Sequence, residues 1–199
     1  MSDDNNPGLF PYKAHTMKVN ALKPVVPHLI AVLVFTVISF LYFYPVLEGR
    51  KINAHDTKVY EGSSKEISDY REQYGKEPLW TNSMFGGMPA YMISAKYPGN
   101  LFKHLDDFLK IYRTPVAALF LSMLGFYILL LFCRVNPWLA MAGAIAYGFA
   151  SYLFVSLSAG HNTKAYAMAY MAPVVGSVVY AFRKHALTGA ILFALFMSL

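Results

Sequence analysis

Four long stretches without charged side chains dominate the hydrophobic pattern of the chain. They contain 24, 20, 29 and 18 residues and lie between Lys23 and Glu48, Arg113 and Arg134, Arg134 and Lys164, and Lys164 and Arg183. About 20 apolar residues cross the hydrocarbon core of a bilayer as a helix, so the pattern predicts membrane spans. Their expected bounds are 28–47, 115–133, 137–157 and 165–182. A fifth apolar run, 186–199, reaches the last residue, and we expect a truncated span of a longer protein.

A polar segment, 48–113, separates the first two spans. It carries ten Lys and Arg and nine Asp and Glu residues, so it is nearly neutral. Ser63 and Glu66 have the spacing of a capping box, which predicts a helix from Ser63 to about Tyr74. Gly75 would end this helix, because glycine adopts the left-handed conformation found just beyond helix ends.

Two further elements are expected in the same segment. Trp80 to Tyr91 is rich in Gly, Pro and aromatic residues, which predicts an ordered turn rather than a helix. Asn100 would cap a second helix, 101–112, with an apolar stripe on one face and charges on the other. This pattern is typical of a helix lying in the membrane interface, and a soluble helix packed on the rest of the segment is the alternative.

Proline positions predict where the spans begin, end and bend. Pro45 would end the first span, and Pro173 would kink the fourth. Thr114-Pro115 and Asn136-Pro137 each combine a capping side chain with a proline at the first helical position, so they would start the second and third spans. The small residues of the third span predict close packing in a helix bundle.

The distribution of charge predicts the orientation in the membrane. The short segments that would face the cytoplasm hold six basic residues, namely Lys13, Lys18, Lys23, Arg134, Arg183 and Lys184. The short outer segment holds only Lys164, which agrees with the positive-inside rule. We therefore expect 1–27 to be a disordered cytoplasmic tail, the first span to be an uncleaved signal anchor, and 48–113 to be extracytoplasmic.

Composition supports a membrane protein and narrows the classes of partner. The chain is 56% hydrophobic and 14% charged, whereas globular domains carry about a quarter charged residues. Its formal net charge of +6 comes from basic residues spread thinly beside the spans, so nucleic acid is not an expected partner. The single cysteine, Cys133, excludes an internal disulfide.

Asp56 is the first candidate for chemistry, because it follows the first span closely enough to meet a lipid headgroup. A carboxylate there serves either as a general base toward an acceptor hydroxyl or as a ligand to a divalent metal. Exposed loop aspartates without a function are common, and His55 beside it is a weaker candidate for substrate binding. No nucleotide-binding loop, zinc-protease motif or serine-hydrolase motif occurs.

A second candidate is the outer turn 158–164, which contains His161, Asn162 and Lys164. Backbone N–H groups at a helix N-terminus, with a Lys and a His nearby, form a phosphate site; the alternative is a capped turn whose Lys164 reaches toward the interface. Trp80 beside Gly86-Gly87 offers a ring for sugar stacking, or else a hydrophobic plug of the loop.

Three blocks of sequence resemble the bacterial YfhO family of membrane proteins, in its Bacteroidetes form. The blocks are Asp56-Thr57-Lys58, the run from Glu77 through Trp80-Thr81-Asn82-Ser83-Met84-Phe85-Gly86-Gly87-Met88-Pro89 to Tyr91, and Gly160-His161-Asn162-Thr163-Lys164. The resemblance covers nearly the whole chain after the tail. That family is longer, resembles the GT-C superfamily of glycosyltransferases, and lies in the cytoplasmic membrane. The resemblance therefore implies an all-α, multi-pass, GT-C-like domain over 28–199, of which this would be the N-terminal part.

The resemblance implies an inverting glycosyltransferase with a polyprenyl-phosphate-linked sugar donor and an extracytoplasmic acceptor, either a cell-envelope glycan or a lipid. Asp56 would be the general base, with Asp69 in reserve, and His161 and Lys164 would stabilise the lipid phosphate. Thr57-Lys58 departs from the more apolar residue and Gln expected after the family's aspartate. A lipid-linked sugar flippase and a non-catalytic structural subunit are the alternatives. Later parts of the longer protein would complete the site, so this segment alone is expected to be inactive.

Overall fold

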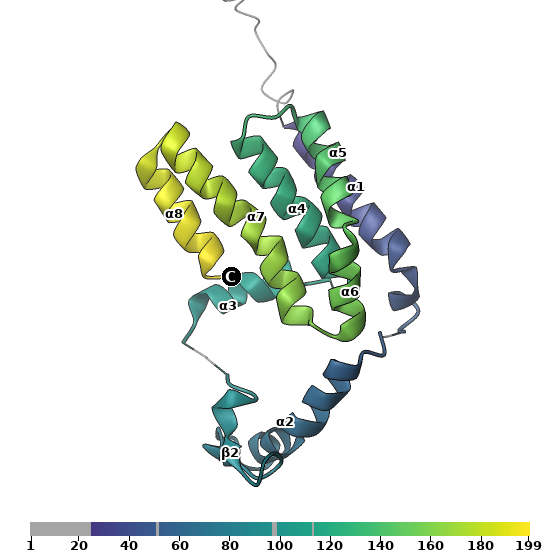
Figure 1. Cartoon of the computed structure of the whole chain (residues 1–199), viewed down its shortest axis with the longest axis vertical. Coiled ribbons are helices and arrows are strands. Elements are labelled where there is room, and N and C mark those ends of the chain that lie inside the picture. The colour runs from purple at the N-terminus through teal and green to yellow at the C-terminus, as the bar shows by residue number, and fades with distance from the viewer. Residues whose placement is uncertain (1–24, 51, 97–98, 113) are drawn as a thin grey trace, which may run out of the picture.

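The computed structural model describes residues 25–50, 52–96, 99–112 and 114–199, and these residues are mostly helical (Figure 1). The all-α prediction is therefore confirmed, with one short β-hairpin added. The expected tail falls largely outside the described residues, as do Lys13, Lys18 and Lys23. The elements are α1 (Val26–Tyr42), η1 (Tyr44–Val46), α2 (His55–Tyr74), β1 (Trp80–Thr81), β2 (Met88–Pro89), η2 (Ala90–Met92), α3 (Leu101–Leu109), α4 (Val116–Phe132), α5 (Pro137–Gly148), α6 (Ser151–Ala159), α7 (Asn162–Arg183) and α8 (Ala186–Met197).

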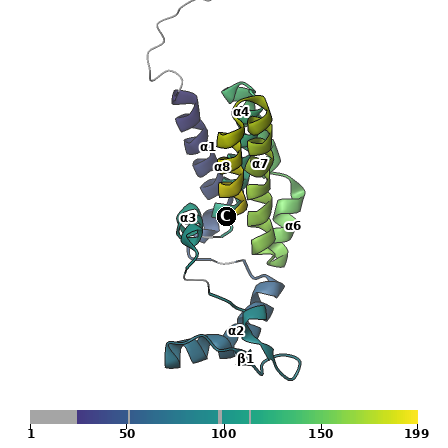
Figure 2. The same cartoon turned by 90° about the vertical axis from the view of Figure 1, so that its left-hand side faces the viewer.

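The apolar helices form a bundle from which α2 and the hairpin project at one end (Figures 1 and 2). The central helix is α4, which packs against α7, α5 and α1, and α8 packs on the outer side of α7. Ala117, Leu119 and Met123 of α4 are completely buried. The α6–α7 turn lies at the same end as α2, whereas the α4–α5 and α7–α8 turns lie at the other end (Figure 1).

Glycines and one proline set the close approach of α4 and α7. Pro173 lies inside α7 and has no N–H group, so the carbonyl of Ala169 one turn earlier lacks its usual helical donor. Gly125 of α4 packs directly against that carbonyl, and a Cβ built on Gly125 would overlap its oxygen. The missing side chain of Gly125 therefore lets the backbones of α4 and α7 approach closely.

The lengths of the bundle helices agree only in part with the expected spans. Only α7, with 22 residues, is by itself long and apolar enough to cross a membrane among the residues that the structure describes. The predicted third span is broken into α5 and α6, which meet at 42° and qualify only as a pair. The apolar helices α1, α4 and α8 are shorter, with 17, 17 and 12 residues.

Two details of the predicted spans are wrong. The first helix ends at Tyr42 rather than near 47, and Pro45 lies in the short η1 that follows. The third span is not one uninterrupted helix. α5 ends at Gly148, a weak helix former that packs on Met123, and Ala150 is extended before α6 begins.

The start of α2 is also predicted wrongly. The helix begins at His55, eight residues before Ser63, whose hydroxyl donates to the carbonyl of Tyr60 inside the helix. Glu66 does not close a capping box, because its carboxylate accepts hydrogen bonds from the hairpin. The predicted end is confirmed: Gly75 has a φ of 64° and follows the last helical residue.

The chain after α2 folds back onto it. Trp80 and Thr81 pair antiparallel with Pro89 and Met88, so the expected ordered turn is a hairpin. The Arg71 guanidinium binds the carboxylate of Glu77 and both the hydroxyl and the carbonyl of Ser94. This side chain is only 11% exposed, so it fastens both ends of the returning segment to α2.

α3 lies across the end of the bundle and turns Asp106 toward it, whereas Lys103, His104 and Asp107 are exposed. Asn100 caps it as predicted, accepting from the N–H of Phe102, but the helix ends at Leu109 rather than 112. Its Asp106 accepts a hydrogen bond from the Tyr170 hydroxyl of α7 at 2.9 Å. Leu101, Phe102, Leu105 and Phe108 of the apolar stripe are exposed, whereas Leu109 and Tyr112 pack against the core.

Of the two predicted caps of the later spans, one is confirmed. Asn136 accepts from the N–H of Trp138, and Pro137 is the first residue of α5. Thr114 does not cap α4, because Pro115 holds the capping position. The Thr114 hydroxyl instead shares a hydrogen bond with the Tyr166 hydroxyl of α7.

Candidate active site

The N-terminus of α2 meets the α6–α7 turn at the end of the bundle, and the two predicted candidate regions come together there. Asp56 lies in the first turn of α2, and His161 immediately precedes α7. The Oδ2 atom of Asp56 and the Nε2 atom of His161 are 2.6 Å apart. The structure therefore joins two residues that are more than a hundred positions apart in the sequence.

Gly160 allows this approach. It ends α6 in a left-handed conformation, with a φ of 97°, which costs glycine little. A Cβ at this position would lie 3.0 Å from the Cβ of Ala54 and from both the backbone nitrogen and the Oγ1 of Thr57. The absence of a side chain at Gly160 thus lets the turn contact the start of α2 and places His161 beside Asp56.

The electrostatics of the junction favour a negative group. The N-termini of α2 and α7 both carry partial positive charge from their unpaired N–H groups, and Asp56 lies at the first of them. The side chains of Asp56 and His161 are 47% and 48% exposed, so their contact is screened by solvent and adds at most about 1 kcal/mol to folding. Among the described residues His161 is the one side chain bonded to Asp56, which leaves Oδ1 open to a ligand.

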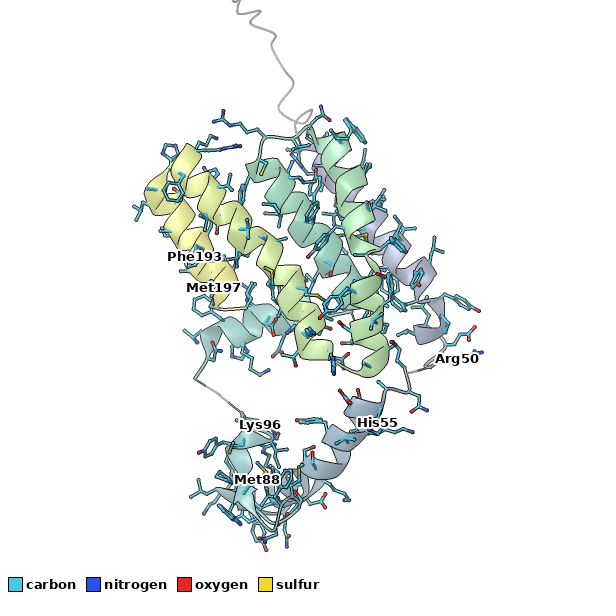
Figure 3. The ribbon with its side chains drawn as sticks, in the orientation of Figure 1. Arg50, His55, Met88, Lys96, Phe193 and Met197 are labelled. Carbon is cyan, nitrogen blue, oxygen red and sulfur yellow. The ribbon has the colours of Figure 1, made fainter. Side chains whose placement is uncertain are left out.

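Asn162 and Arg50 extend the site on one side. They line a cavity of about 170 Å³ together with Val46, Ile52, Ala54, Thr57, Thr114 and Leu157. Arg50 lies in the junction before α2, close to His55 (Figure 3). Sequence reasoning missed Arg50, because it is one of ten basic residues in the 48–113 segment and no spacing distinguishes it.

A larger groove, of about 550 Å³, opens on the other side of Asn162 between α3, α7 and α8. Its polar end contains Lys110, whose ammonium lies 2.5 Å from the Asp106 carboxylate and 4.4 Å from the centre of the Tyr166 ring. Its far end is apolar and includes Met171, Val174, Phe196 and Met197. Met197 and Phe193 mark the α8 side of this region in Figure 3.

Two predicted binding residues lie beside the pair without bonding to it. The Lys164 ammonium lies 4.8 Å from the centre of the Tyr152 ring of α6, where a cation is attracted by the ring face. The His55 side chain is exposed and makes no hydrogen bond within the part of the chain that the structure describes. Neither side chain takes part in the Asp56–His161 contact.

Asp69 and Trp80 are placed away from the pair. Asp69 is about 20 Å from Asp56 along the helix axis, and it binds Lys65, whose pKa is raised by this hydrogen bond and by the charge of the carboxylate. The Trp80 ring covers Gly87, and its indole N–H donates to the side chain of Asn82. Both residues belong to the outer half of the projecting unit.

The divalent metal considered for Asp56 stays a prediction. The contact brings together one carboxylate and one imidazole, whereas Mg²⁺ and Ca²⁺ prefer six or more oxygen ligands. Nowhere in 25–50, 52–96, 99–112 and 114–199 do three or more His, Cys, Asp or Glu side chains gather as a possible metal site.

The chemistry available at the junction is that of a carboxylate held by an imidazole beside two helix N-termini. Such a group accepts a proton at its open oxygen, and an anion is stabilised close by. No protein-family model, curated protein or solved structure matches the chain.

Proposed function

We propose that the chain is the N-terminal part of a multi-pass protein of the bacterial cytoplasmic membrane, with a GT-C-like architecture. In this proposal it transfers a sugar from a polyprenyl-phosphate-linked donor to an extracytoplasmic acceptor, a cell-envelope glycan or a lipid. The observation that carries the proposal is the contact between Asp56 and His161, at the end of an apolar helix bundle.

The distribution of side chains along the bundle supports membrane insertion. Helices α1, α7 and α8 expose large apolar side chains, among them Leu33, Val175 and Ile191, which water would disfavour and lipid accepts. Arg134 and Arg183 lie at the end opposite to α2, and the Arg183 guanidinium donates to the carbonyl of Cys133. Basic residues at one end and a long polar segment at the other fit an inside and an outside face.

The orientation of α3 supports an interfacial position. A soluble helix buries its apolar stripe and exposes its charges. α3 departs from this pattern in part, because Asp106 faces the bundle while Phe108 is 67% exposed; Lys103 and Asp107 are exposed as well, and Leu109 packs against the core. An exposed apolar stripe at the end of an apolar bundle fits a helix whose outer face rests in the headgroup region.

The groove beside Asn162 supports a lipid-linked donor. Its apolar length along α7 and α8 accommodates a hydrocarbon chain, and its polar end lies at the N-terminus of α7. A phosphate placed there would meet backbone N–H groups and the positive end of the helix dipole. Lys110, which is paired with Asp106, and Asn162 are among the polar side chains that line this end of the groove.

The proposed reaction is a single inverting displacement. An acceptor hydroxyl donates its proton to Oδ1 of Asp56 while its oxygen attacks the anomeric carbon of the sugar. The bond from this carbon to the phosphate oxygen breaks, and the lipid phosphate leaves with the electron pair. His161 holds the other carboxylate oxygen and thereby fixes the orientation of the base.

The test is sugar transfer by the full-length protein in vesicles containing a polyprenyl-phosphate sugar. We expect Asp56→Asn to lower the rate by about 10²–10⁴-fold, the usual contribution of a general base. Glu61→Gln is the control, because it removes an exposed carboxylate from the same helix. Wild-type transfer by Asp56→Asn would refute the proposed base. Movement of the lipid-linked sugar across the membrane without transfer would identify a flippase. A structural subunit would keep its function when Asp56 and His161 are changed and lose it when the Trp80 region is changed.

A further inference from the structure

A second open groove, of about 580 Å³, runs along the outer half of α2, beyond the Asp56–His161 pair. Two tyrosines of α2, Tyr70 and Tyr74, lie on one side of it, and Ser83 of the hairpin lies on the other. The proposed transfer reaction uses none of these residues. The groove is therefore separate from the residues that carry the proposed reaction.

The two tyrosines present an aromatic surface. Their ring centres are 4.7 Å apart with an angle of 42° between the ring planes, so each ring supports the other. The side chains remain 39% and 55% exposed, although each carries a large apolar ring. Exposed and mutually supported rings provide faces on which the C–H groups of a ligand pack.

Hydrogen bonds hold the hairpin wall of the groove. Glu66 accepts from the Thr81 hydroxyl at 2.6 Å and from the backbone N–H of Asn82 at 2.9 Å. The Ser83 hydroxyl donates to the carbonyl of Ser63 at 2.8 Å. These bonds fix the hairpin to α2, so the shape of the groove exists before a ligand binds, which lowers the entropic cost of binding.

The charges along the groove are already paired. Lys65 and Asp69 form a salt bridge at 2.8 Å, and the Glu66 carboxylate is occupied by the hairpin. The groups left for a ligand are the Tyr70 and Tyr74 rings and hydroxyls and the amide of Gln73. Aromatic faces beside neutral donors and acceptors suit a ligand with both C–H faces and hydroxyls, which is the chemistry of a sugar chain.

We propose that this groove binds a neutral oligosaccharide, the acceptor for the transfer at Asp56. Tyr74 lies about five helical turns beyond Asp56 and so projects from the same side of α2. The groove begins at Gly62, about 9 Å from Asp56 along the helix axis. Gly62 lies about a third of a turn around α2 from Asp56, so a sugar chain that extends beyond this end of the groove would reach the general base along the surface of the helix.

This assignment deepens the proposed function and rests on it for the acceptor role alone. Binding of the oligosaccharide is measured without any reaction, so the two proposals fail separately. If Asp56→Asn transferred sugar normally, the proposed base would be refuted while the binding groove would stand.

The test is saturation-transfer NMR on the full-length protein in nanodiscs, with cellotetraose, chitotetraose and maltotetraose as probes. We expect at least one probe to bind and the double change Tyr70→Ala, Tyr74→Ala to weaken its affinity at least tenfold. The double change to Phe retains the rings and restores most of the affinity. Tyr91→Ala is the control, because Tyr91 is an exposed aromatic residue of the same segment outside the groove.

Three results would overturn the assignment. The first is that none of the three probes binds. The second is that the double change to Ala leaves the affinity within twofold of wild type. The third is that Tyr91→Ala weakens binding as much as the groove change, because the effect would then not be specific to the groove. Both tyrosines are exposed, so their removal leaves the fold in place, and a wild-type unfolding temperature of the variant confirms this.

Discussion

Gly160 provides the sharpest test of how the fold builds the Asp56–His161 contact. Replacing it with Ala introduces two separable perturbations. The first is backbone strain, because a non-glycine residue in a left-handed conformation costs about 1–2 kcal/mol. The second is steric, because the new Cβ would lie 3.0 Å from Ala54 and Thr57 at the start of α2, closer than ordinary packing allows.

Gly75 separates the two perturbations. It also ends a helix in the left-handed conformation, with a φ of 64°, but a Cβ there meets no atom within 4 Å. Gly75→Ala therefore carries the strain alone. Gly160→Ala carries the same strain and must also move the α6–α7 turn away from α2, which lengthens the Asp56–His161 contact.

We expect Gly75→Ala to lower the free energy of unfolding by about 1 kcal/mol and to leave sugar transfer unchanged. Gly160→Ala should cost about 1–3 kcal/mol more, as overpacking does, and should slow transfer, because the reacting groups are displaced from their aligned positions. Thermal unfolding in detergent and initial transfer rates measure the two effects. Equal losses in the two variants would refute the steric argument.

Three further outcomes follow from the packing. Gly125→Ala should lower the unfolding temperature by several degrees, because the new Cβ overlaps a backbone carbonyl of α7. In Gly143→Ala the new Cβ contacts only the movable end of a leucine side chain, so the unfolding temperature should fall less. Arg71→Met should make the 77–94 segment sensitive to protease while the bundle stays intact, because about 1.5–3 kcal/mol is lost per charged hydrogen bond. Brominated lipid should quench the fluorescence of a tryptophan introduced at Phe108 but not of one introduced at His104, because only Phe108 lies on the apolar stripe of α3.

The sequence predicted features that depend on nearby residues. Asn100 and Asn136 cap the helices expected of them, and Gly75 ends α2, because a cap needs only the side chain and the N–H groups beside it. These contacts are local, so the pattern of residues was sufficient.

The features that sequence reasoning missed depend on distant contacts. Ser63 and Glu66 have the spacing of a capping box, but the hairpin binds Glu66, so α2 continues back to His55. Thr114 would cap α4, but its hydroxyl binds Tyr166 of α7 instead. The spacing of residues along the chain does not predict that Glu66 binds the hairpin or that Thr114 binds Tyr166.

The candidate site shows the same division. Topology predicted that Asp56 and the turn containing His161 lie on the same face of the membrane, and the structure places the two side chains in contact. The exclusion of Lys164 from that contact, and the presence of Arg50 and Lys110 in the adjoining cavities, required the packed helices.

A double-mutant cycle of sugar transfer tests the central claim most directly. Its four proteins are the wild type, Asp56→Asn, His161→Gln and the combined variant, each as the full-length protein in donor-containing vesicles. If Asp56 and His161 act as one unit, the combined variant should transfer no more slowly than Asp56→Asn alone. Independent, multiplying losses from the two changes would contradict the account, and so would wild-type transfer by Asp56→Asn.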